Sequence, residues 1–296
     1  MDTTVQVGER TLRLTNLEKV LYPETGTTKA EVIEYYARVA PTLLPHIADR
    51  AMTLKRFPDG VETKGFFEKR CPSHRPDWMP TAIGPGDREG EVRYCVLDEP
   101  AALVWAANMA ALELHAPMAL AEDLDAPRAV VFDFDPGAPA TIRECCQIAL
   151  LVKDVLQGVG LRAWAKTSGS KGLQVYVPVN APLEHEHASS FALAVGQLLE
   201  KEHRARVTTT MAKVVRPGKV FIDWSQNNRH KTTIAVYSLR ARPQPTVSTP
   251  VTWDEVEAGA EGDTALRFEW KDVLDRIEHV GDLFAEVLTE VQQLPG

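Results

Sequence analysis

The stretch AVVFDFD, residues 129–135, constrains the fold of this chain more than any other feature of its sequence. Its apolar residues are those of a buried strand, yet two carboxylates stand one residue apart at Asp133 and Asp135. Alternate side chains of a strand share a face and each residue advances about 3.3 Å, so the two acids project together, about 6.6 Å apart at Cα. Phe132 and Phe134 then pack on the opposite face. The stretch therefore predicts a buried strand that presents two carboxylates on one side.

Three carboxylates are candidates for one metal site. Asp133 and Asp135 can share hard cations, and two metal ions about 3.5 to 4 Å apart are the arrangement used for nucleotidyl transfer. Asp223 ends the apolar run KVFID, and a third carboxylate would complete the protein ligands of such a pair. The alternative is that these acids lie at solvated strand ends, which is the commoner meaning of an isolated D-x-D pattern.

The segment KTSGSKGLQ, residues 166–174, indicates a glycine-rich turn between two strands. Backbone N–H groups of such a turn can bind an anion, and Ser168, Ser170 and Lys171 add donors suited to phosphate oxygens. The Walker A pattern is absent. A plain hairpin turn is the alternative.

The charge is unevenly distributed along the chain. The net charge of -8 argues against a polyanionic partner, but residues 201–242 hold ten Lys or Arg and two acids. Residues 251–296 hold three Lys or Arg and twelve acids. Donors gather around Asp223, namely Arg216, Lys219, Gln226, Lys231, Arg240 and Arg242. A basic middle favours polyanion binding on one face, with a solvated surface as the alternative.

The succession of elements predicts an α+β fold with a mixed central sheet flanked by helices. The expected helices span 28–47, capped by Thr28, then 102–115, 140–158, 188–204 and 266–291. The expected strands span 129–135, the two arms of 161–179, 213–225 and 231–239, and a hairpin with a polar tip spans 84–94. No signal peptide or membrane-spanning run is present, which favours the cytoplasm, with no membrane partner.

Four cysteines stand at positions 71, 95, 145 and 146. Two are adjacent and the others lie far apart, so reduced thiols are the simpler interpretation. Cys71, His74 and Cys95 have a conceivable metal-ligand spacing, but no second C-x-x-C pair completes a zinc site. A surface loop is favoured there.

Three motifs carry a specific resemblance. VVFDFDPG, KTSGSKGL and GKVFIDWSQN…KTTIAVYSLR resemble the signatures of the polymerase domain of bacterial ligase D, in the archaeo-eukaryotic primase superfamily. LTNLEKVLYPETGTTK, GFFEK and LELHAP are similar to the family in the same order, so the resemblance covers nearly the whole chain. It implies a primase-type catalytic core in a single domain, 1–296. Residues 1–117 would contact the template and a 5′-phosphate, 118–250 would form the core and 251–296 an acidic helical tail.

The resemblance also implies the role of each site residue. Asp133, Asp135 and Asp223 would hold two Mn²⁺ or Mg²⁺ ions. The nucleotide would be held by His115, Ser168, Lys171, Arg216, Gln226 and Arg240, with Ser170 and Gln174 of the glycine turn beside them. Asn16, Lys19 and Lys29 match a pocket that reads a downstream 5′-phosphate, and Phe66 and Phe67 match residues that stack on template bases. The alternatives are a core histidine at 115, an ordinary helix cap at 16–19 and a core aromatic pair at 66–67.

Two departures from the family pattern stand out. Gln174 occupies a position that is ordinarily His, and a glutamine cannot carry the charge of an imidazolium. The chain shows no lysine-nucleophile ligase motif and no nuclease segment, so we expect a stand-alone polymerase or an excised domain.

The expected function is that of a DNA-dependent polymerase that fills short gaps at 5′-phosphorylated ends in break or excision repair. Ribonucleotides would be preferred over deoxyribonucleotides, and a Ku-type end-binding protein and a separate DNA ligase would be partners near the nucleoid. The alternatives are a primase-polymerase of replication restart, and a DNA-end-binding module with weak catalysis. The hairpin tip at 87–90 would bridge DNA ends or form an idle surface turn.

Overall fold

The computed structural model describes residues 2–85 and 90–295, whose contacts group them into two compact units. Unit 1 comprises Met1–Glu122, Thr232–Ser248 and Phe268–Gly281. Unit 2 comprises Asp123–Lys231, Thr249–Arg267 and Asp282–Gly296. Each unit has its own sheet and helices. The expected division of a single domain into the parts 1–117, 118–250 and 251–296 stays a prediction. The expected hairpin tip at 87–90 lies largely outside the described residues.

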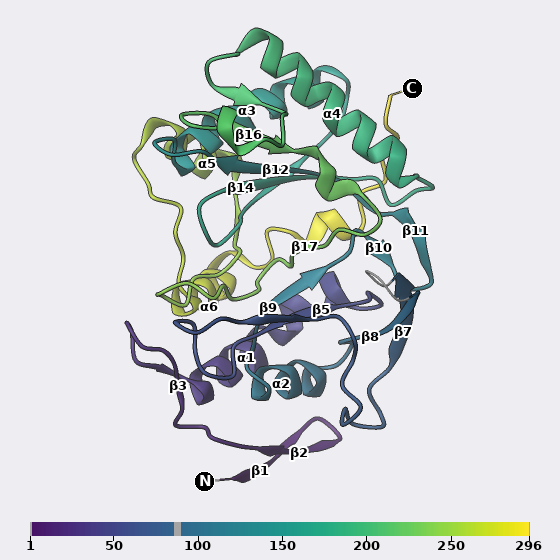
Figure 1. Cartoon of the computed structure of the whole chain (residues 1–296), viewed down its shortest axis with the longest axis vertical. Coiled ribbons are helices and arrows are strands. Elements are labelled where there is room, and N and C mark those ends of the chain that lie inside the picture. The colour runs from purple at the N-terminus through teal and green to yellow at the C-terminus, as the bar shows by residue number, and fades with distance from the viewer. Residues whose placement is uncertain (1, 86–89, 296) are drawn as a thin grey trace. The chain divides into compact units, whose positions relative to one another are not determined.

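Unit 2 is built on a six-stranded sheet of order β15-β16-β12-β14-β13-β18 (Figure 1). Its strands are β12 (Ala129–Pro136), β13 (Trp164–Thr167), β14 (Leu173–Pro178), β15 (Val207–Thr208), β16 (Val220–Asp223) and β18 (Pro250–Val251); β11 (Asp123–Pro127) belongs to the same unit. Neighbouring strands are antiparallel, except that β15 and β16 are parallel. The strand predicted from the DFD alternation is therefore confirmed, and it lies in the interior of the sheet.

The helices of unit 2 are α3 (Ile142–Gly158), α4 (His185–Glu202) and α5 (Trp253–Glu261). Phe132 of β12 packs edge to face against Phe191 of α4, with ring centroids 6.4 Å apart. The thiol of Cys145 in α3 lies against the carbonyl oxygen of Phe134. Because α3 and α4 cover the phenylalanine side of β12, the acids that alternate with these rings project from the other face of the sheet.

The sheet of unit 1 has the order β17-β9-β5-β6. Its strands are β5 (Thr53–Arg56), β6 (Phe66–Glu68), β9 (Ala111–Ala116) and β17 (Thr233–Ile234). The remaining strands of the unit are β1 (Thr3–Val7), β2 (Arg10–Leu14), β3 (Val20–Tyr22), β4 (Thr27–Thr28), β7 (Thr81–Pro85), β8 (Glu91–Cys95) and β10 (Ala119–Leu120). β7 and β8 pair antiparallel, as the hairpin prediction for 84–94 requires.

The helices of unit 1 are α1 (Lys29–Ile47), α2 (Pro100–Asn108) and α6 (Trp270–Val280). Thr28 caps α1 as predicted: its side chain accepts from the Glu31 N–H, and the Glu31 carboxylate accepts from the Thr28 N–H. Tyr35 on the buried face of α1 packs edge to face against Trp270 of α6. Among the described residues, no helix is long and apolar enough to cross a membrane.

The helix predicted over 102–115 is wrong in its second half. α2 ends at Asn108, and after Ala110, whose φ is 56°, the chain continues as strand β9. The residues of ALELHA alternate between apolar and polar, as in a strand. The segment is short and almost completely buried, however, and hydrophobic periodicity alone does not distinguish such a strand from part of a core helix. Leu112 and Leu114 consequently share one face of the sheet, and Glu113 and His115 share the other.

Two further predictions overestimated regular structure. The helix expected over 266–291 is reduced to α6 and a short 3₁₀ turn, Ala285–Leu288, because Gly281 (φ 71°) ends α6. The strands expected over 213–225 and 231–239 are reduced to β16 and β17. The 3₁₀ turns Lys213–Val215 and Trp224–Asn227 replace the rest of the first strand. α5 (Trp253–Glu261) lies within the acidic helical tail expected over 251–296, but ahead of the helix expected over 266–291.

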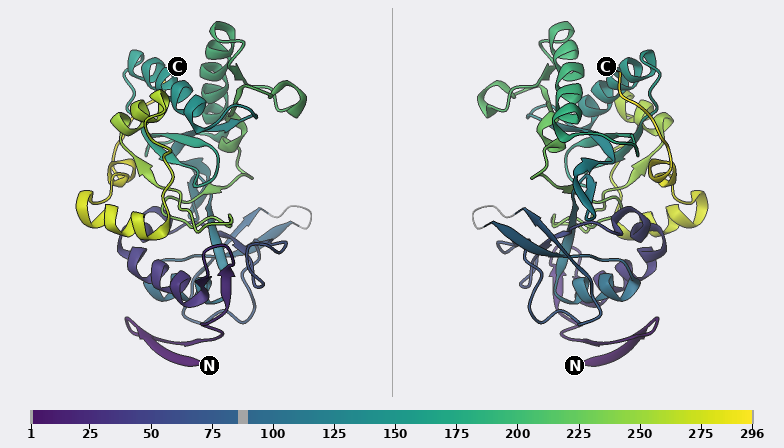
Figure 2. Two further views of the ribbon diagram at one scale, coloured as in Figure 1. Left: turned by 90° about the vertical axis from the view of Figure 1, so that its left-hand side faces the viewer. Right: turned by 90° about the vertical axis from the view of Figure 1, so that its right-hand side faces the viewer.

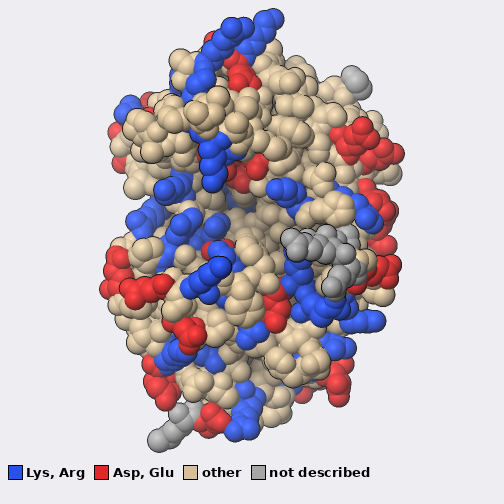
Figure 3. All heavy atoms as spheres, in the orientation of Figure 1, with Lys and Arg blue, Asp and Glu red and all other residues tan. Residues whose placement is uncertain are grey.

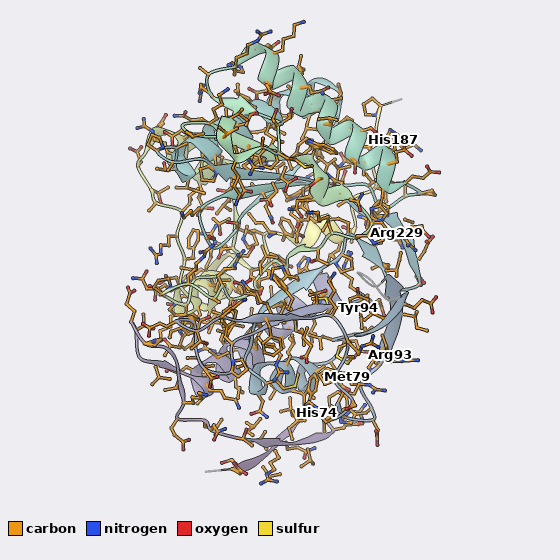
Figure 4. All side chains as sticks on the ribbon, in the orientation of Figure 1. His74, Met79, Arg93, Tyr94, His187 and Arg229 are labelled. Carbon is orange, nitrogen blue, oxygen red and sulfur yellow. A yellow bond between two sulfur atoms is a disulfide. The ribbon has the colours of Figure 1, made fainter. Side chains whose placement is uncertain are left out.

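The expectation of reduced thiols is wrong for one pair of cysteines. Cys71 and Cys95 form a disulfide, with Cα atoms 4.8 Å apart. The backbone N–H of Cys71 donates to the carbonyl of Arg93, which brings the loop against β8. Arg93 and Tyr94 of this strand are labelled in Figure 4. Neither sulfur is therefore available to bind a metal together with His74. Cys145 and Cys146 are free and buried.

Candidate active site

Four polar side chains form a row across the sheet of unit 2. On β12, Asp133 lies opposite Asp223 of β16 on one side and opposite Gln174 of β14 on the other. Gln174 in turn lies opposite Lys166 of β13. Directly opposed residues of antiparallel strands project to the same face. Asp135 is two residues further along β12 on that face, so the structure brings all three predicted acids to one side of the sheet.

The carboxylate of Asp133 is electrostatically strained. Burial and the neighbouring charges of Asp135 and Asp223 raise its pKa to about 7, although a hydrogen bond from Gln174 and the charge of Lys166 oppose the shift. Lys166 is 1% exposed, and its ammonium donates to the Gln174 Oε1 at 2.7 Å. The row therefore concentrates negative charge at one end and a buried cation at the other.

Asp223 is held by the 3₁₀ turn that follows it. Its carboxylate accepts from the backbone N–H and hydroxyl of Ser225, at 3.1 and 2.6 Å, and from the Gln226 amide at 2.9 Å. Gln226, predicted to contact a nucleotide, thus holds a predicted metal ligand. Among the described residues, no group of three His, Cys, Asp or Glu side chains is arranged so that it could hold a metal ion. Three carboxylates crowded on one face nevertheless fit hard divalent cations, because a cation would relieve their repulsion.

The glycine turn lies directly beside β12. Ser168 organises it: its backbone N–H donates to the Gly172 carbonyl, and its hydroxyl accepts from the N–H groups of Ser170 and Gly172. A side chain at Gly172 would collide with the Phe134 carbonyl oxygen at 2.1 Å, so only glycine allows the turn to pack this closely. The side chains of Ser170 and Lys171 remain exposed. Ser168 therefore shapes the turn, and its neighbours present the donors.

Arg216 lies on a loop anchored to the end of β12. The Gly137 N–H donates to the Lys219 carbonyl at 2.8 Å, and a side chain at Gly137 would collide with the Arg216 carbonyl oxygen. The Arg216 guanidinium stacks over the Phe221 ring at 3.6 Å and donates to the Met211 carbonyl. Unit 2 thus brings together the acids, the glycine turn, Gln174, Gln226 and Arg216.

The segment between α4 and β16 is strongly basic. Figure 2 shows it projecting from the rest of unit 2, and Figure 3 shows Lys and Arg side chains gathered beyond the C-terminal end of α4. Its cations, with those at the end of α4, are Lys201, Arg204, Arg206, Lys213, Arg216 and Lys219. A surface of this kind suits a polyanion.

In unit 1, His115 belongs to a charged cluster that the sequence did not predict. Glu113, 1% exposed, accepts from the His115 Nε2 at 2.9 Å and the Arg240 Nε at 3.3 Å. It also accepts from the backbone N–H of Ala241, and the Lys55 ammonium lies 3.5 Å away. Burial acts to raise the pKa of Glu113, but its bond from His115 and the charges of Arg240 and Lys55 hold it well below the usual range.

Phe66 and Phe67 project to opposite faces of β6 and are both exposed. Phe67 lies opposite Lys55, whose ammonium is 5.3 Å from the ring, and packs edge to face against His115. Phe66 lies beneath the Arg56 guanidinium at 5.4 Å. The alternative of an ordinary buried aromatic pair is therefore wrong.

The three residues expected to read a 5′-phosphate lie together in unit 1. The Lys19 N–H donates to the Asn16 carbonyl, and the Lys29 N–H donates to the Lys19 carbonyl. The Lys29 ammonium is buried and donates to the Thr15 carbonyl at 2.6 Å. The Lys19 ammonium is paired with Asp59 at 2.8 Å, and Asn16 has a φ of 51°.

Sequence reasoning missed Glu113, Lys55 and Lys166. Residues two apart do not face each other on a helix, so a helix over 102–115 separates Glu113 from His115, whereas the alternation in LELHA places them together in a strand. Lys166 begins the KTSG motif, and its burial beside Gln174 was not predictable from the motif alone.

Comparisons with known proteins identify the family of this chain. The family model for the LigD primase-polymerase domain matches residues 28–284. The chain belongs to this family. A multifunctional non-homologous end joining protein LigD from Mycolicibacterium smegmatis is 46% identical over 277 residues, 93% of this chain and 36% of that protein. A bifunctional LigD from Bacillus subtilis is 29% identical over 96% of this chain and 45% of that protein.

A solved structure shares the fold. The polymerase domain of Mycobacterium tuberculosis ligase D, in complex with DNA, is 40% identical and superposes with a TM-score of 0.87. The alignment covers 95% of this chain and 99% of that domain. The α+β fold with a mixed sheet and flanking helices is thereby confirmed. The chain spans between about a third and a half of the length of the LigD proteins it matches.

Proposed function

We propose that this chain is a DNA-directed nucleotidyltransferase that fills short gaps at 5′-phosphorylated ends, with ribonucleotides preferred, during the repair of broken DNA. The observation that carries the proposal is the placement of Asp133, Asp135 and Asp223 on one face of a sheet, beside a glycine turn with exposed donors. The name of the LigD relatives and the DNA in the solved relative support end joining and a DNA substrate.

The three acids would hold two Mn²⁺ or Mg²⁺ ions, which when bound supply activation of a primer 3′-hydroxyl and charge compensation for the triphosphate. The chain's own residues prepare this site. Ser225 and Gln226 hold the Asp223 carboxylate in a defined position. The Lys166 ammonium orients the amide group of Gln174, which donates a hydrogen bond to Asp133.

Binding of the substrates is assigned to the surrounding donors. Ser170, Lys171 and the N–H groups of the glycine turn would contact the triphosphate, assisted by Arg216. We also assign contacts with a nucleotide to His115 and Arg240. Phe66 and Phe67, exposed on opposite faces of β6, are available for stacking on template bases, and Asn16, Lys19 and Lys29 would bind the downstream 5′-phosphate. A Ku-type end-binding protein and a DNA ligase are the partners that this role requires.

The testing experiment is primer extension across a one-nucleotide gap with Mn²⁺, with and without the 5′-phosphate. The Asp133→Ala, Asp135→Ala double variant should lose at least about 1,000-fold in rate, because residues that hold the metals act as a unit. Asp154→Ala, a change of an exposed acid on α3, is the matched control and should retain full activity. Tight DNA binding without any addition by the wild type would instead support an end-binding module.

A further inference from the structure

Gln174 and Lys166 belong to the polar row across the sheet of unit 2. Lys166 of β13 lies opposite Gln174 of β14, and Gln174 lies opposite Asp133 of β12. Gln174 is 3% exposed and Lys166 is 1% exposed, so both side chains are enclosed by the protein. The Lys166 ammonium lies 5.5 Å from the centre of the Tyr176 ring and donates to the Gln174 Oε1 at 2.7 Å. The amide of Gln174 is thus placed between a buried cation and a carboxylate of the candidate metal site.

The chemistry of these two neighbours fixes the orientation of the amide. An ammonium can only donate hydrogen bonds, and an ionised carboxylate can only accept them. The Gln174 Oε1 therefore faces Lys166, and its Nε2 faces Asp133, to which the amide donates. The reversed amide would place two donors together at Lys166 and two acceptors together at Asp133. The three side chains form a relay in which each hydrogen bond runs in one direction, from Lys166 through Gln174 to Asp133.

A direct ion pair would have a different effect on a metal site. An ammonium in contact with Asp133 would neutralise the carboxylate and compete with a metal cation for its oxygen atoms. Gln174 separates the two charges, and its hydrogen bond still restrains the rotation of the carboxylate. Partners that hold a metal-binding side chain in this way raise the metal affinity of a site. An amide between Lys166 and Asp133 therefore suits the support of a metal ligand.

A neutral histidine, the residue ordinarily found at position 174 in the family, has the hydrogen-bonding capacity that this relay needs. One ring nitrogen of a neutral imidazole accepts and the other donates, so it can satisfy both neighbours as the amide does. We propose that Gln174 is a positioning residue that links Lys166 to Asp133 and orients this carboxylate for a divalent cation. The inference rests on the proposed function, because it assigns a cation to Asp133. It gives Gln174 a role in the support of the metal site in place of contact with the nucleotide.

Binding of Mn²⁺ to the nucleotide-free protein tests the proposal without turnover. Free Mn²⁺ is measured by electron paramagnetic resonance at pH 8, above the pKa of Asp133. Gln174→Met removes both hydrogen bonds and keeps an unbranched side chain, and we expect it to weaken Mn²⁺ binding at least about tenfold. Gln157→Met, the same change at an exposed glutamine of α3, is the matched control and should bind Mn²⁺ as the wild type does. A residue that contacts only the nucleotide cannot change metal binding in its absence, so equal affinities of Gln174→Met and the wild type would overturn the proposal.

Gln174→His tests whether the relay, rather than the amide itself, is required. The imidazole that this change introduces can accept from Lys166 and donate to Asp133, so Mn²⁺ affinity should stay within about threefold of the wild type. The nitrogen-15 NMR spectrum of this variant at pH 8 should show a neutral ring in a single tautomer. Mn²⁺ binding as weak as that of Gln174→Met would contradict the relay. A doubly protonated ring, which has no acceptor for Lys166, or a mixture of tautomers would do the same, and this spectrum decides the question even if Gln174→Met does not fold.

Gap filling separates failure of the relay from failure of the proposed function. The expected order of Mn²⁺ affinities, without any nucleotide addition by the wild type, would refute the proposed function and leave the relay intact. Efficient gap filling in which Gln174→Met and the wild type need the same Mn²⁺ concentration for half-maximal rate would refute the relay alone. A wild type that neither binds Mn²⁺ nor adds a nucleotide would refute both.

Discussion

Asp133 of unit 2 and Glu113 of unit 1 are both carboxylates in an interior strand of a sheet, but their neighbours act on them in opposite directions. Burial and the neighbouring carboxylates raise the pKa of Asp133 to about 7. His115, Arg240 and Lys55 hold the pKa of Glu113 well below its usual range despite burial. Burial acts to raise the pKa of both acids, so the opposite directions of the two shifts come from the neighbouring charges, which are negative around Asp133 and positive around Glu113.

Removal of the Glu113 carboxylate and removal of the Asp133 carboxylate should therefore change the free energy of unfolding in opposite directions. Glu113→Leu leaves Arg240 and Lys55 without their counter-charge, and we expect it to lower the free energy of unfolding by about 3 kcal/mol. Asp133→Asn removes repulsion and should stabilise the metal-free protein at pH 8. Chemical denaturation of both variants measures the difference, and equal destabilisation would contradict the comparison.

The pH dependence of stability sharpens the comparison at Asp133. Its folded pKa, about 7, lies above the unfolded value of about 3.9, so between these values the folded state binds more protons and its stability falls as pH rises. The stability of Asp133→Asn relative to the wild type should thus increase by about 2 kcal/mol from pH 5 to pH 8. Mn²⁺ competes with protons for the carboxylates, so it should stabilise the wild type more at pH 8 than at pH 6. Thermal unfolding with and without the metal measures both, and a pH-independent difference would argue against the crowded acids.

A smaller effect of pH is expected at Lys29, a cation whose pKa is also shifted by burial and by neighbouring charges. Burial and the charges of Lys19 and Arg56 lower its pKa to about 8, so its ammonium loses its proton as pH rises from 7 to 9. Stimulation of gap filling by a downstream 5′-phosphate should fall roughly threefold over this range. The measured quantity is the ratio of rates with and without the phosphate at each pH, which cancels other pH effects. Lys29→Arg should make the ratio independent of pH, because arginine stays charged.

Much of the acidic face of the unit 2 sheet could be predicted because its signals are local. A period of two in AVVFDFD places two acids on one face, glycines mark the turn at 168–172, and Thr28 marks the start of a helix. The family could likewise be identified from short motifs, and the comparisons confirm it. These features depend on backbone geometry within a few residues, which the sequence specifies directly.

What only the tertiary structure decided involves residues far apart in the chain. Arg240 lies 127 positions from Glu113, and their contact depends on how the segment after β17 returns to β9. The strand identity of 111–116, the Cys71–Cys95 disulfide and the Lys166–Gln174 pair follow likewise from pairing and packing. In β12, sequence alone determined which side chains share a face of the strand. The electrostatic state of those side chains was set by neighbours that only the folded chain brings within a few ångströms.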